Sequence, residues 1–282
     1  MRAKPPPEMP HSSTSGGSGR GANARPYGVF VDHVIVFGMT TRIPTRVALI
    51  AVAALTLVVS TGAADGNNTL TAAEKAAGWR LLFDGSSTTG WRGYNKPDTS
   101  GLRWMVKDGA VCLPPADGKD TRGHRDMISA DTFGDFDLTW QWQVQPGSNS
   151  GLKYFVVESG PSAIGHEYQL IDDARHADAK ISTERQTASF YDVKTATAHP
   201  TKPIGEWNTS RVLVQGNHVE HWLNGTKVLE YELGSPEILA AVQDSKFKPN
   251  AGFGTKKAGH ILLQDHGDAV CYRDVKIRPG TT

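Results

Sequence analysis

The stretch that decides the fold is residues 135–144, DFDLTWQWQV, in which apolar and polar side chains alternate without interruption. One side of this stretch carries five apolar residues: Phe136, Leu138, Trp140, Trp142 and Val144. A period of two is typical of a β-strand with one face in a core and the other in solvent. Residues 135–144 therefore predict a half-buried strand in an all-β domain.

Further short segments repeat this pattern, and Gly and Pro residues separate them. They are residues 104–106, 110–113, 151–157, 166–171, 189–193, 211–215, 218–223, 226–231 and 270–277. Between two of them lies Asn224-Gly225, a dipeptide that favours a tight hairpin. We expect a single helix over residues 235–245, because Ser235 can cap it and Pro236 suits its first position. Many short strands with one helix predict a sandwich or a barrel.

The first 64 residues differ in composition from the rest of the 282-residue chain. They hold six Arg and Lys against two Asp and Glu, whereas all seven Trp lie after residue 78. The whole chain has a net charge of +1 and is 38% hydrophobic, which excludes a disordered polyelectrolyte and gives no overall charge for nucleic acid. We expect one folded domain over residues 79–282, preceded by a linker over residues 65–78.

Export explains the N-terminal composition. Met39 is followed by two Arg residues, by the apolar run 47–59 and by small residues before Asp65, which together predict a signal peptide over residues 39–64. The run is shorter than the roughly 20 residues of a membrane span, and an uncleaved anchor is the alternative. We expect residues 1–38 to be a disordered or wrongly assigned extension, and the mature protein to be secreted or periplasmic.

Two cysteines, Cys112 and Cys271, lie in the expected exported part. An oxidising compartment would permit a disulfide between them. Two separate buried thiols fit the sequence equally well.

The usual catalytic motifs do not occur in the sequence: a nucleophile elbow, a phosphate loop, a dinucleotide fingerprint or a zinc-protease helix. Alternation in residues 166–171 puts Glu167 and Gln169 on one face and Tyr168 and Leu170 on the other. The pattern alone slightly favours a solvated polar face, but Ile171 shares that face and indicates partial cover. A covered carboxylate could have a raised pKa and act as an acid or a base.

Two polar segments are further candidates. Residues 264–268, QDHGD, contain His266, whose side chain suits proton transfer near neutral pH, although a surface turn rich in Asp and Gly is the alternative. Residues 172–178 contain Asp and His, which can bind metals, but their spacing fits no standard metal loop and favours a solvated loop. A divalent metal is therefore possible but not implied, and no other cofactor is indicated.

Residues 79–277 resemble the 3-keto-disaccharide hydrolase domain family, formerly a domain of unknown function in secreted bacterial proteins. Seven motifs in order carry the resemblance: LFDG at 82–85 with GW at 90–91, NSG at 149–151, EYQLID at 167–172, GEWN at 205–208, HWLNG at 221–225 and LQDHG at 263–267. The chain departs from similar proteins at Ser189, where a Gly is usual, and at Phe190, where a smaller or aliphatic residue is usual.

The resemblance implies a concanavalin-like jelly-roll β-sandwich that acts on glycosides oxidised to a ketone at C3 of the sugar. Removal of the C2 proton would give an enolate, loss of the C1 substituent would break the glycosidic bond, and water would then add. For this chemistry we predict His266 as base, Lys153 as enolate stabiliser and Glu167 as second acid or base. The residues expected to orient the sugar and the catalytic groups are Gln169, Asp172, Tyr191 and Asp265.

Two non-enzymatic alternatives are a carbohydrate-binding module of the same fold without turnover and an interaction domain of the cell envelope. For the enzyme and for the carbohydrate-binding module the expected partner is a carbohydrate. We expect no nucleic-acid partner, and membrane contact only through an uncleaved anchor. Nothing in the sequence indicates an oligomeric state.

Overall fold

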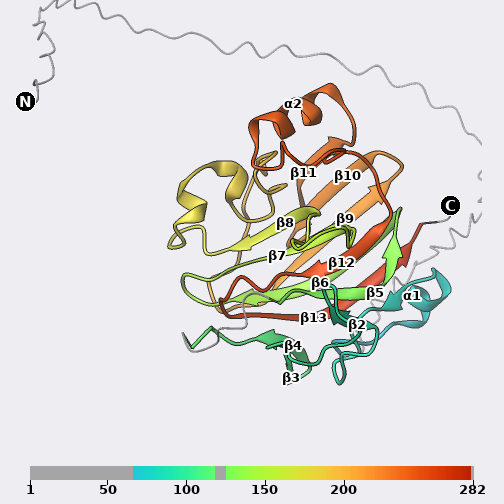
Figure 1. Ribbon diagram of the computed structural model, residues 1–282. Helices are drawn as coiled ribbons and strands as arrows, with labels where there is room; N and C mark the ends of the chain where they lie inside the picture. The colour runs from blue at the N-terminus through green and yellow to red at the C-terminus, as the bar shows by residue number, and fades with distance from the viewer. Residues whose placement is uncertain (1–65, 118–124, 281–282) are drawn as a thin grey trace, which may run out of the picture. The chain divides into compact units, whose positions relative to one another are not determined.

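The structure is a computed structural model that describes residues 66–117 and 125–280, all within one compact unit. Two antiparallel sheets form a β-sandwich, as predicted (Figure 1). The expected N-terminal extension and signal peptide lie outside the described residues. No helix in the described ranges is long and apolar enough to cross a membrane.

The larger sheet has eight strands in the order β11-β10-β9-β6-β13-β4-β3, with β1 paired to β13. Its strands are β1 (Arg80–Leu81), β3 (Met105–Lys107), β4 (Ala110–Leu113), β6 (Phe136–Val144), β9 (Asn208–Gln215), β10 (His218–Leu223), β11 (Thr226–Glu232) and β13 (Val270–Pro279).

The smaller sheet has five strands in the order β2-β5-β12-β7-β8. They are β2 (Trp91–Gly93), β5 (Met127–Phe133), β7 (Asn149–Val156), β8 (His166–Ile171) and β12 (Gly259–Leu263). The helices of the described residues are α1 (Ala72–Ala76), α2 (Pro236–Asp244) and two 3-10 turns, η1 (Asp178–Lys180) and η2 (Thr183–Arg185). Figure 1 shows α2 above the ends of β10 and β11, and the yellow segment after β8 beside that strand.

The alternating stretch that predicted the fold is β6, which lies between β9 and β13. Its five apolar residues are all buried, and Trp140 and Trp142 are each 1% exposed. On the opposite face Asp137 is also buried, because Arg211 and Arg278 neutralise its carboxylate at 2.5 and 3.0 Å. The prediction of a half-buried strand is confirmed.

A predicted turn, a predicted helix cap and a disulfide are all present in the structure. Asn224 and Gly225 have φ angles of 47° and 83° and form the tight turn between β10 and β11, as predicted. The Ser235 side chain caps α2 by accepting a hydrogen bond from the Ile238 N–H, also as predicted. Cys112 and Cys271 are directly paired residues of β4 and β13 and form a disulfide.

Two segments differ from the sequence-based expectation. Residues 189–193 form a turn rather than a strand, because Ala188 and Asp192 adopt positive φ and only Phe190 makes isolated bridges. In the segment expected to be a linker, Thr71 and Glu74 form a capping box on α1. Lys276 of β13 holds Glu74 at 3.1 Å, so α1 is tied to the sandwich.

The smaller sheet is buried on both faces. Its inner face carries Leu152, Tyr168 and Leu263 into the main core. Its outer face carries a second apolar cluster of Ile128, Val156, Ala163 and Leu262, with Tyr94 packed against it. Loops therefore cover the outer face of this sheet, and all six residues of β8 are buried.

Candidate functional site

A cavity of about 600 Å³ lies over the outer face of the smaller sheet. Its walls come from the segments 94–102, 125–126, 161–164, 246–247 and 264–266, and Lys153 of β7 lies among them. The polar side chains that line it include Arg125, Asp126, Lys153, Lys246, Gln264, Asp265 and His266. Such a mixture of cationic, carboxyl and imidazole groups in a hollow is typical of a binding or catalytic site.

Lys153 and Glu167 meet because their strands pair in register. They are direct partners on β7 and β8, and Lys153 Nζ lies 3.6 Å from Glu167 Oε2. The Glu167 side chain leans over Gly151, where an added Cβ would lie 2.9 Å from Glu167 Cδ. The glycine of the NSG motif thus makes room for the carboxylate that pairs with the lysine.

Burial dominates the electrostatics of Glu167. Its side chain is 4% exposed, and desolvation raises its pKa although Lys153 and Lys246 favour the charged form. The solvated-face interpretation of β8 is therefore wrong, and the interpretation of a covered carboxylate is the one that the burial of Glu167 supports. Glu167 does not line the cavity, whereas Lys153 does. Seen from the cavity, the Glu167 carboxylate therefore lies beyond the Lys153 ammonium group.

Asp126 is a second carboxyl group of the site that sequence reasoning missed. It lines the cavity and accepts a hydrogen bond from the Asp265 N–H at 2.8 Å. Burial raises its pKa, Lys153 opposes that rise, and the charges of Glu167 and Asp265 add to it. The available signal was its position immediately before β5, a strand whose sequence, MISADTF, does not alternate and was not recognised.

The Asp265 carboxylate binds three neighbouring groups at the edge of the cavity. Its carboxylate binds Arg103 Nη2 at 2.7 Å and accepts hydrogen bonds from the N–H groups of Arg125 and Gly267 at 3.2 and 3.0 Å. These contacts fix the backbone of residues 265–267, and with it the position of His266. His266 lines the same cavity as Lys153, and its side chain is 44% exposed at the rim.

Three other predicted residues support the site from outside the cavity. Gln169 is fully buried beside Glu167 and donates to the Arg185 carbonyl at 3.3 Å. The Tyr191 N–H donates to the Glu167 carbonyl at 3.1 Å, and the Tyr191 hydroxyl donates to an Asp178 carboxylate oxygen at 2.7 Å. Asp172 organises its own loop through the Gly147 and Ala174 N–H groups and is not among the lining residues.

Lys246 connects Tyr191 to the cavity. Its ammonium group lies 4.1 Å from the centre of the Tyr191 ring, and the residue lines the cavity wall. Burial lowers its pKa, and the nearby Lys153 charge adds to this, while Glu167 opposes it. Sequence reasoning did not single out Lys246, because it follows α2 in a polar segment without a motif.

The departure at residues 189–190 is accommodated in the structure. Ser189 is buried, donates to the Thr183 carbonyl at 3.1 Å and accepts from the Ala196 N–H at 3.0 Å. Phe190 stacks on Tyr231 with ring centres 4.9 Å apart. The larger residues thus fill an enclosed space without disturbing the Tyr191 contact to Glu167.

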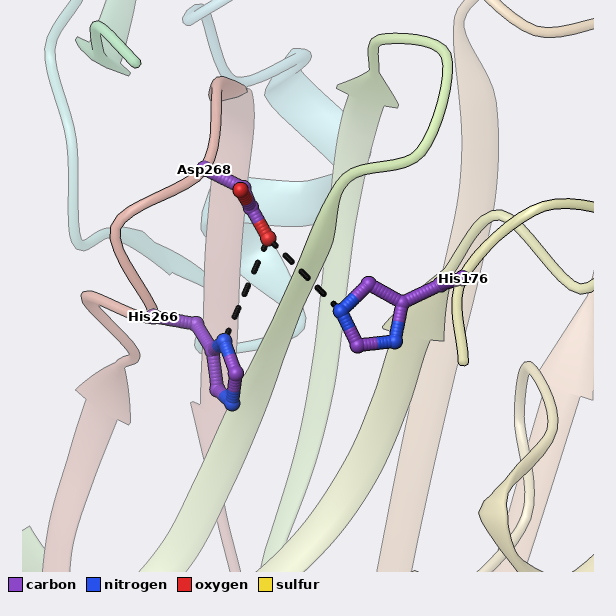
Figure 2. Close-up of side chains that lie close together, drawn as sticks. All are labelled: His176, His266 and Asp268. Atoms are coloured by element: carbon purple, nitrogen blue, oxygen red, sulfur yellow. Dashed lines mark ion pairs between the residues drawn. The ribbon is translucent and has the colours of Figure 1, made fainter. Parts of the chain in front are cut away.

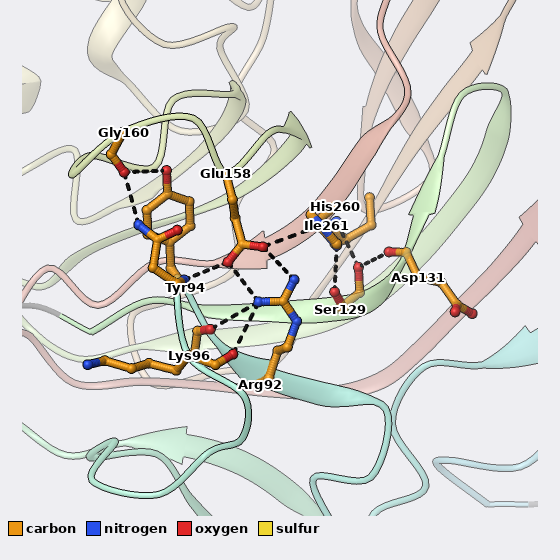
Figure 3. A network of polar contacts seen from close by, with 11 residues as sticks. Arg92, Tyr94, Lys96, Ser129, Asp131, Glu158, Gly160, His260 and Ile261 are labelled. Carbon is orange, nitrogen blue, oxygen red and sulfur yellow. Dashed lines mark hydrogen bonds and ion pairs between the residues drawn. The ribbon is translucent and has the colours of Figure 1, made fainter.

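An ion pair beside the cavity joins β2 to the loop that follows β7 (Figure 3). Arg92 holds Glu158 with two hydrogen bonds of 2.7 and 2.6 Å, and Glu158 also accepts from the Asn95 N–H at 2.6 Å. The Tyr94 hydroxyl donates to carbonyl groups of the 160–162 loop at 3.0 and 3.1 Å. The 94–96 and 158–164 loops are thereby held together beside the cavity.

Known proteins resemble this chain over most of the described domain. Residues 78–278 match the family described as the 3-keto-alpha-glucoside-1,2-lyase-like domain. A protein of Bacteroides thetaiotaomicron named 3-keto-disaccharide hydrolase is 34% identical over 230 residues, which are 72% of this chain and 79% of the relative.

Solved structures share the fold. A candidate glycosyl hydrolase from Parabacteroides distasonis aligns with a TM-score of 0.68 and 30% identity, covering 77% of this chain and all of that protein. A second candidate glycosyl hydrolase from the same organism aligns with a TM-score of 0.57 and 22% identity, covering 72% of this chain and 99% of that protein, and this likeness concerns the fold alone.

Proposed function

We propose, because the chain belongs to the 3-keto-alpha-glucoside-1,2-lyase-like domain family, that it cleaves the glycosidic bond of 3-keto glycosides by elimination followed by hydration. The name of the Bacteroides thetaiotaomicron relative supports a 3-keto disaccharide as the substrate class. The observation that carries the proposal is a single cavity lined by Lys153, Asp126, Lys246 and His266. The Glu167 carboxylate lies buried next to Lys153, outside the cavity lining.

Proton removal from C2 requires a base that touches the substrate. The sequence-based prediction gave this role to His266, and we assign it to Asp126 instead. Asp126 lines the cavity, and its raised pKa makes the carboxylate a stronger base than an exposed aspartate. The Asp265 N–H fixes one of its oxygens and leaves the other for the proton. His266 remains beside the substrate at the rim.

Removal of the C2 proton leaves an electron pair, and the negative charge of the resulting enolate must be stabilised at the C3 oxygen. The Lys153 ammonium can bind that oxygen as its negative charge develops, in a partly enclosed site where such an interaction is strong. Glu167 serves Lys153 rather than the substrate, because it lies behind the ammonium at 3.6 Å and outside the cavity lining. It holds the lysine side chain in place.

The enolate then expels the C1 substituent. The C1–O bond breaks, a double bond forms between C1 and C2, and the leaving oxygen takes a proton from the Lys246 ammonium. A lowered pKa makes this ammonium a better proton donor than an ordinary lysine. Addition of water at C1 and of a solvent proton at C2 completes the reaction and releases 3-keto-glucose.

Incubation of the purified protein with 3-keto-trehalose, 3-keto-sucrose and an aryl 3-keto-glucoside tests the proposal. We expect release of 3-keto-glucose from at least one of them and no release from the unoxidised sugars. Asp126→Asn should lower kcat by about 10²–10⁴-fold, as the removal of a general base does. Binding of oxidised and unoxidised sugars alike, without release, would establish the carbohydrate-binding alternative.

Export from the cytoplasm is also part of the proposal. The apolar run and small-residue exit before Asp65 support a cleaved signal peptide. The Cys112–Cys271 disulfide agrees with this, because disulfides persist mainly in oxidising compartments.

A further inference from the structure

The side chains of His176, His266 and Asp268 point toward one another (Figure 2), and His266 also lines the cavity. His176 comes from the segment after β8, whereas His266 and Asp268 come from the connection between β12 and β13. His176 Nε2 and His266 Nδ1 each lie 3.9 Å from Asp268 Oδ2, and the three donor atoms all lie within 4.8 Å of one another.

These separations are too long for hydrogen bonds, which for N–H···O end near about 3.2 Å. They suit three ligands of one ion better. A point equidistant from three such atoms lies at most about 2.5 Å from each, a few tenths of an ångström more than a zinc–nitrogen bond. A small closure of the two loops would bring all three atoms to bonding distance.

The charge around Asp268 also favours a cation. Its other contact is the Asn149 N–H, at 3.0 Å, and among the described residues no Lys or Arg pairs with it. A second cluster of similar composition, His218, Glu220 and Glu230, differs in this respect. There Lys227 binds Glu220 at 3.2 Å and also binds Glu230, so an ammonium group already supplies the positive charge.

An unpartnered acceptor belongs to the same neighbourhood. The Oδ1 atom of Asn149, the residue whose N–H holds Asp268, is buried and has no hydrogen-bond partner. Asn149 is 2% exposed, so its oxygen lacks bulk solvent as a donor. Water bound to an ion at Asp268 would provide the missing donor, as outer-shell partners of metal sites commonly require.

We propose that His176, His266 and Asp268 bind a divalent transition metal such as Zn²⁺, with an open position directed at the cavity. Two imidazoles and a carboxylate are the ligand set of catalytic zinc sites, which keep one position for water or substrate. A 3-keto sugar offers a ketone and neighbouring hydroxyl groups that can chelate such an ion. This role in catalysis rests on the proposed function, but metal binding does not.

One contact must change when the ion binds. The Asp178 N–H donates to His176 Nδ1 at 3.1 Å, which leaves the ring proton on Nε2, the nitrogen nearest Asp268. Ligation through Nε2 moves that proton to Nδ1, so the hydrogen bond from Asp178 is given up. The neighbouring His266 ring, edge-on at 5.9 Å, can adjust with it.

Calorimetric titration of the chelator-treated, dialysed protein with Zn²⁺ tests the site without any substrate. We expect one ion per chain. His176→Ala and Asp268→Asn should each weaken binding by at least about 100-fold, since removing a direct ligand should cost no less than the 10–100-fold lost with an outer-shell partner. His218→Ala is the matched control and should bind Zn²⁺ like the wild type. Absence of binding by the wild type, or equal binding by His176→Ala, would overturn the proposal.

Cleavage assays separate this inference from the proposed function. Zn²⁺ should restore cleavage in metal-depleted wild type but not in His176→Ala. Zn²⁺ binding without cleavage of any 3-keto glycoside would support the metal site and contradict the proposed function. Full cleavage by the metal-depleted wild type would refute the catalytic role of the ion.

Discussion

Lys153 and Glu167 face each other directly across β7 and β8, with 3.6 Å between the ammonium nitrogen and the nearer carboxylate oxygen. The lysine lines the cavity and the glutamate lies behind it. In the proposed mechanism the two residues therefore have different roles: Lys153 contacts the substrate, and Glu167 supports Lys153. Replacing each member of the pair should therefore affect different properties of the protein.

Lys153→Met should lower kcat by about 10²–10³-fold, because it removes the group that we propose to stabilise the enolate oxygen. Lys153→Arg should restore little of this activity, because a planar guanidinium cannot replace a compact ammonium in a confined position. Steady-state kinetics with a cleaved 3-keto glycoside measures both, with circular dichroism to confirm folding. A folded, fully active Lys153→Met protein would remove Lys153 from the mechanism.

Glu167→Gln should change how stability depends on pH. The pKa of Glu167 is raised on folding above its ordinary value of 4.5, so the folded state holds the proton more tightly than the unfolded state. As the pH rises past the unfolded pKa, the wild type is progressively destabilised until the folded pKa is passed.

In Glu167→Gln no ionisable group stands at this position, so the variant does not lose stability in this way as the pH rises. The free energy of unfolding of the wild type minus that of Glu167→Gln should therefore fall as the pH rises above the ordinary glutamate pKa of 4.5. Urea titrations at a series of pH values measure this difference. A difference that stays constant or rises with pH would mean that the Glu167 pKa is not raised.

Gly151→Ala should destabilise the protein by about 1–3 kcal/mol, the usual range for overpacking a filled interior. The added methyl group would collide with the Glu167 carboxyl group and displace it from Lys153. Gly134→Ala is the control, because nothing lies within 4 Å of its added Cβ. Thermal unfolding of both variants checks this, and equal midpoints would show that Glu167 can move without cost.

Arg92→Ala should raise KM more than it lowers kcat. Its bidentate pair with Glu158 holds β2 to the loop that follows β7 beside the cavity but touches none of the reacting groups (Figure 3). Arg80→Ala serves as control, since the Arg80–Asp131 pair is exposed and surface pairs contribute little. A selective loss of kcat in Arg92→Ala would place Arg92 in the chemistry itself.

The mature protein should begin near Asp65 when isolated from its native host, because a signal peptidase would cut after the small residues that end at Ala64. N-terminal sequencing of the protein from the periplasmic and culture fractions measures this. Mature protein that begins upstream of residue 39 would contradict the export proposal.

The sandwich could be predicted because in strands such as β6 and β9 buried residues recur at every second position, and in β6 all of these are apolar. Lys153 and Glu167 could also be proposed from the sequence, since two successive expected strands contain them, but the pairing of these strands is seen only in the structure. The prediction of a strand over residues 189–193 was wrong. Phe190 and Tyr191 favour strands, but tertiary contacts impose a positive φ at Asp192. Propensity could not reveal those contacts.

The remaining site residues could not be predicted because no local pattern brings them together. Asp126 reaches the cavity through its hydrogen bond to the Asp265 N–H, 139 residues away in the chain. His176 was considered as a metal ligand only within its own segment, whereas its neighbours in space are His266 and Asp268. Metal-loop spacing cannot detect ligands that come from two distant loops.

The most direct test of the account is cleavage of a 3-keto glycoside in D₂O, followed by mass and NMR analysis of the released 3-keto-glucose. Elimination and hydration must exchange the C2 proton with solvent, so the account predicts one deuterium at C2 at the earliest times of the reaction. The same sugar incubated without protein gives the background exchange. Released 3-keto-glucose without deuterium at C2 beyond that background would show direct hydrolysis and contradict the mechanism.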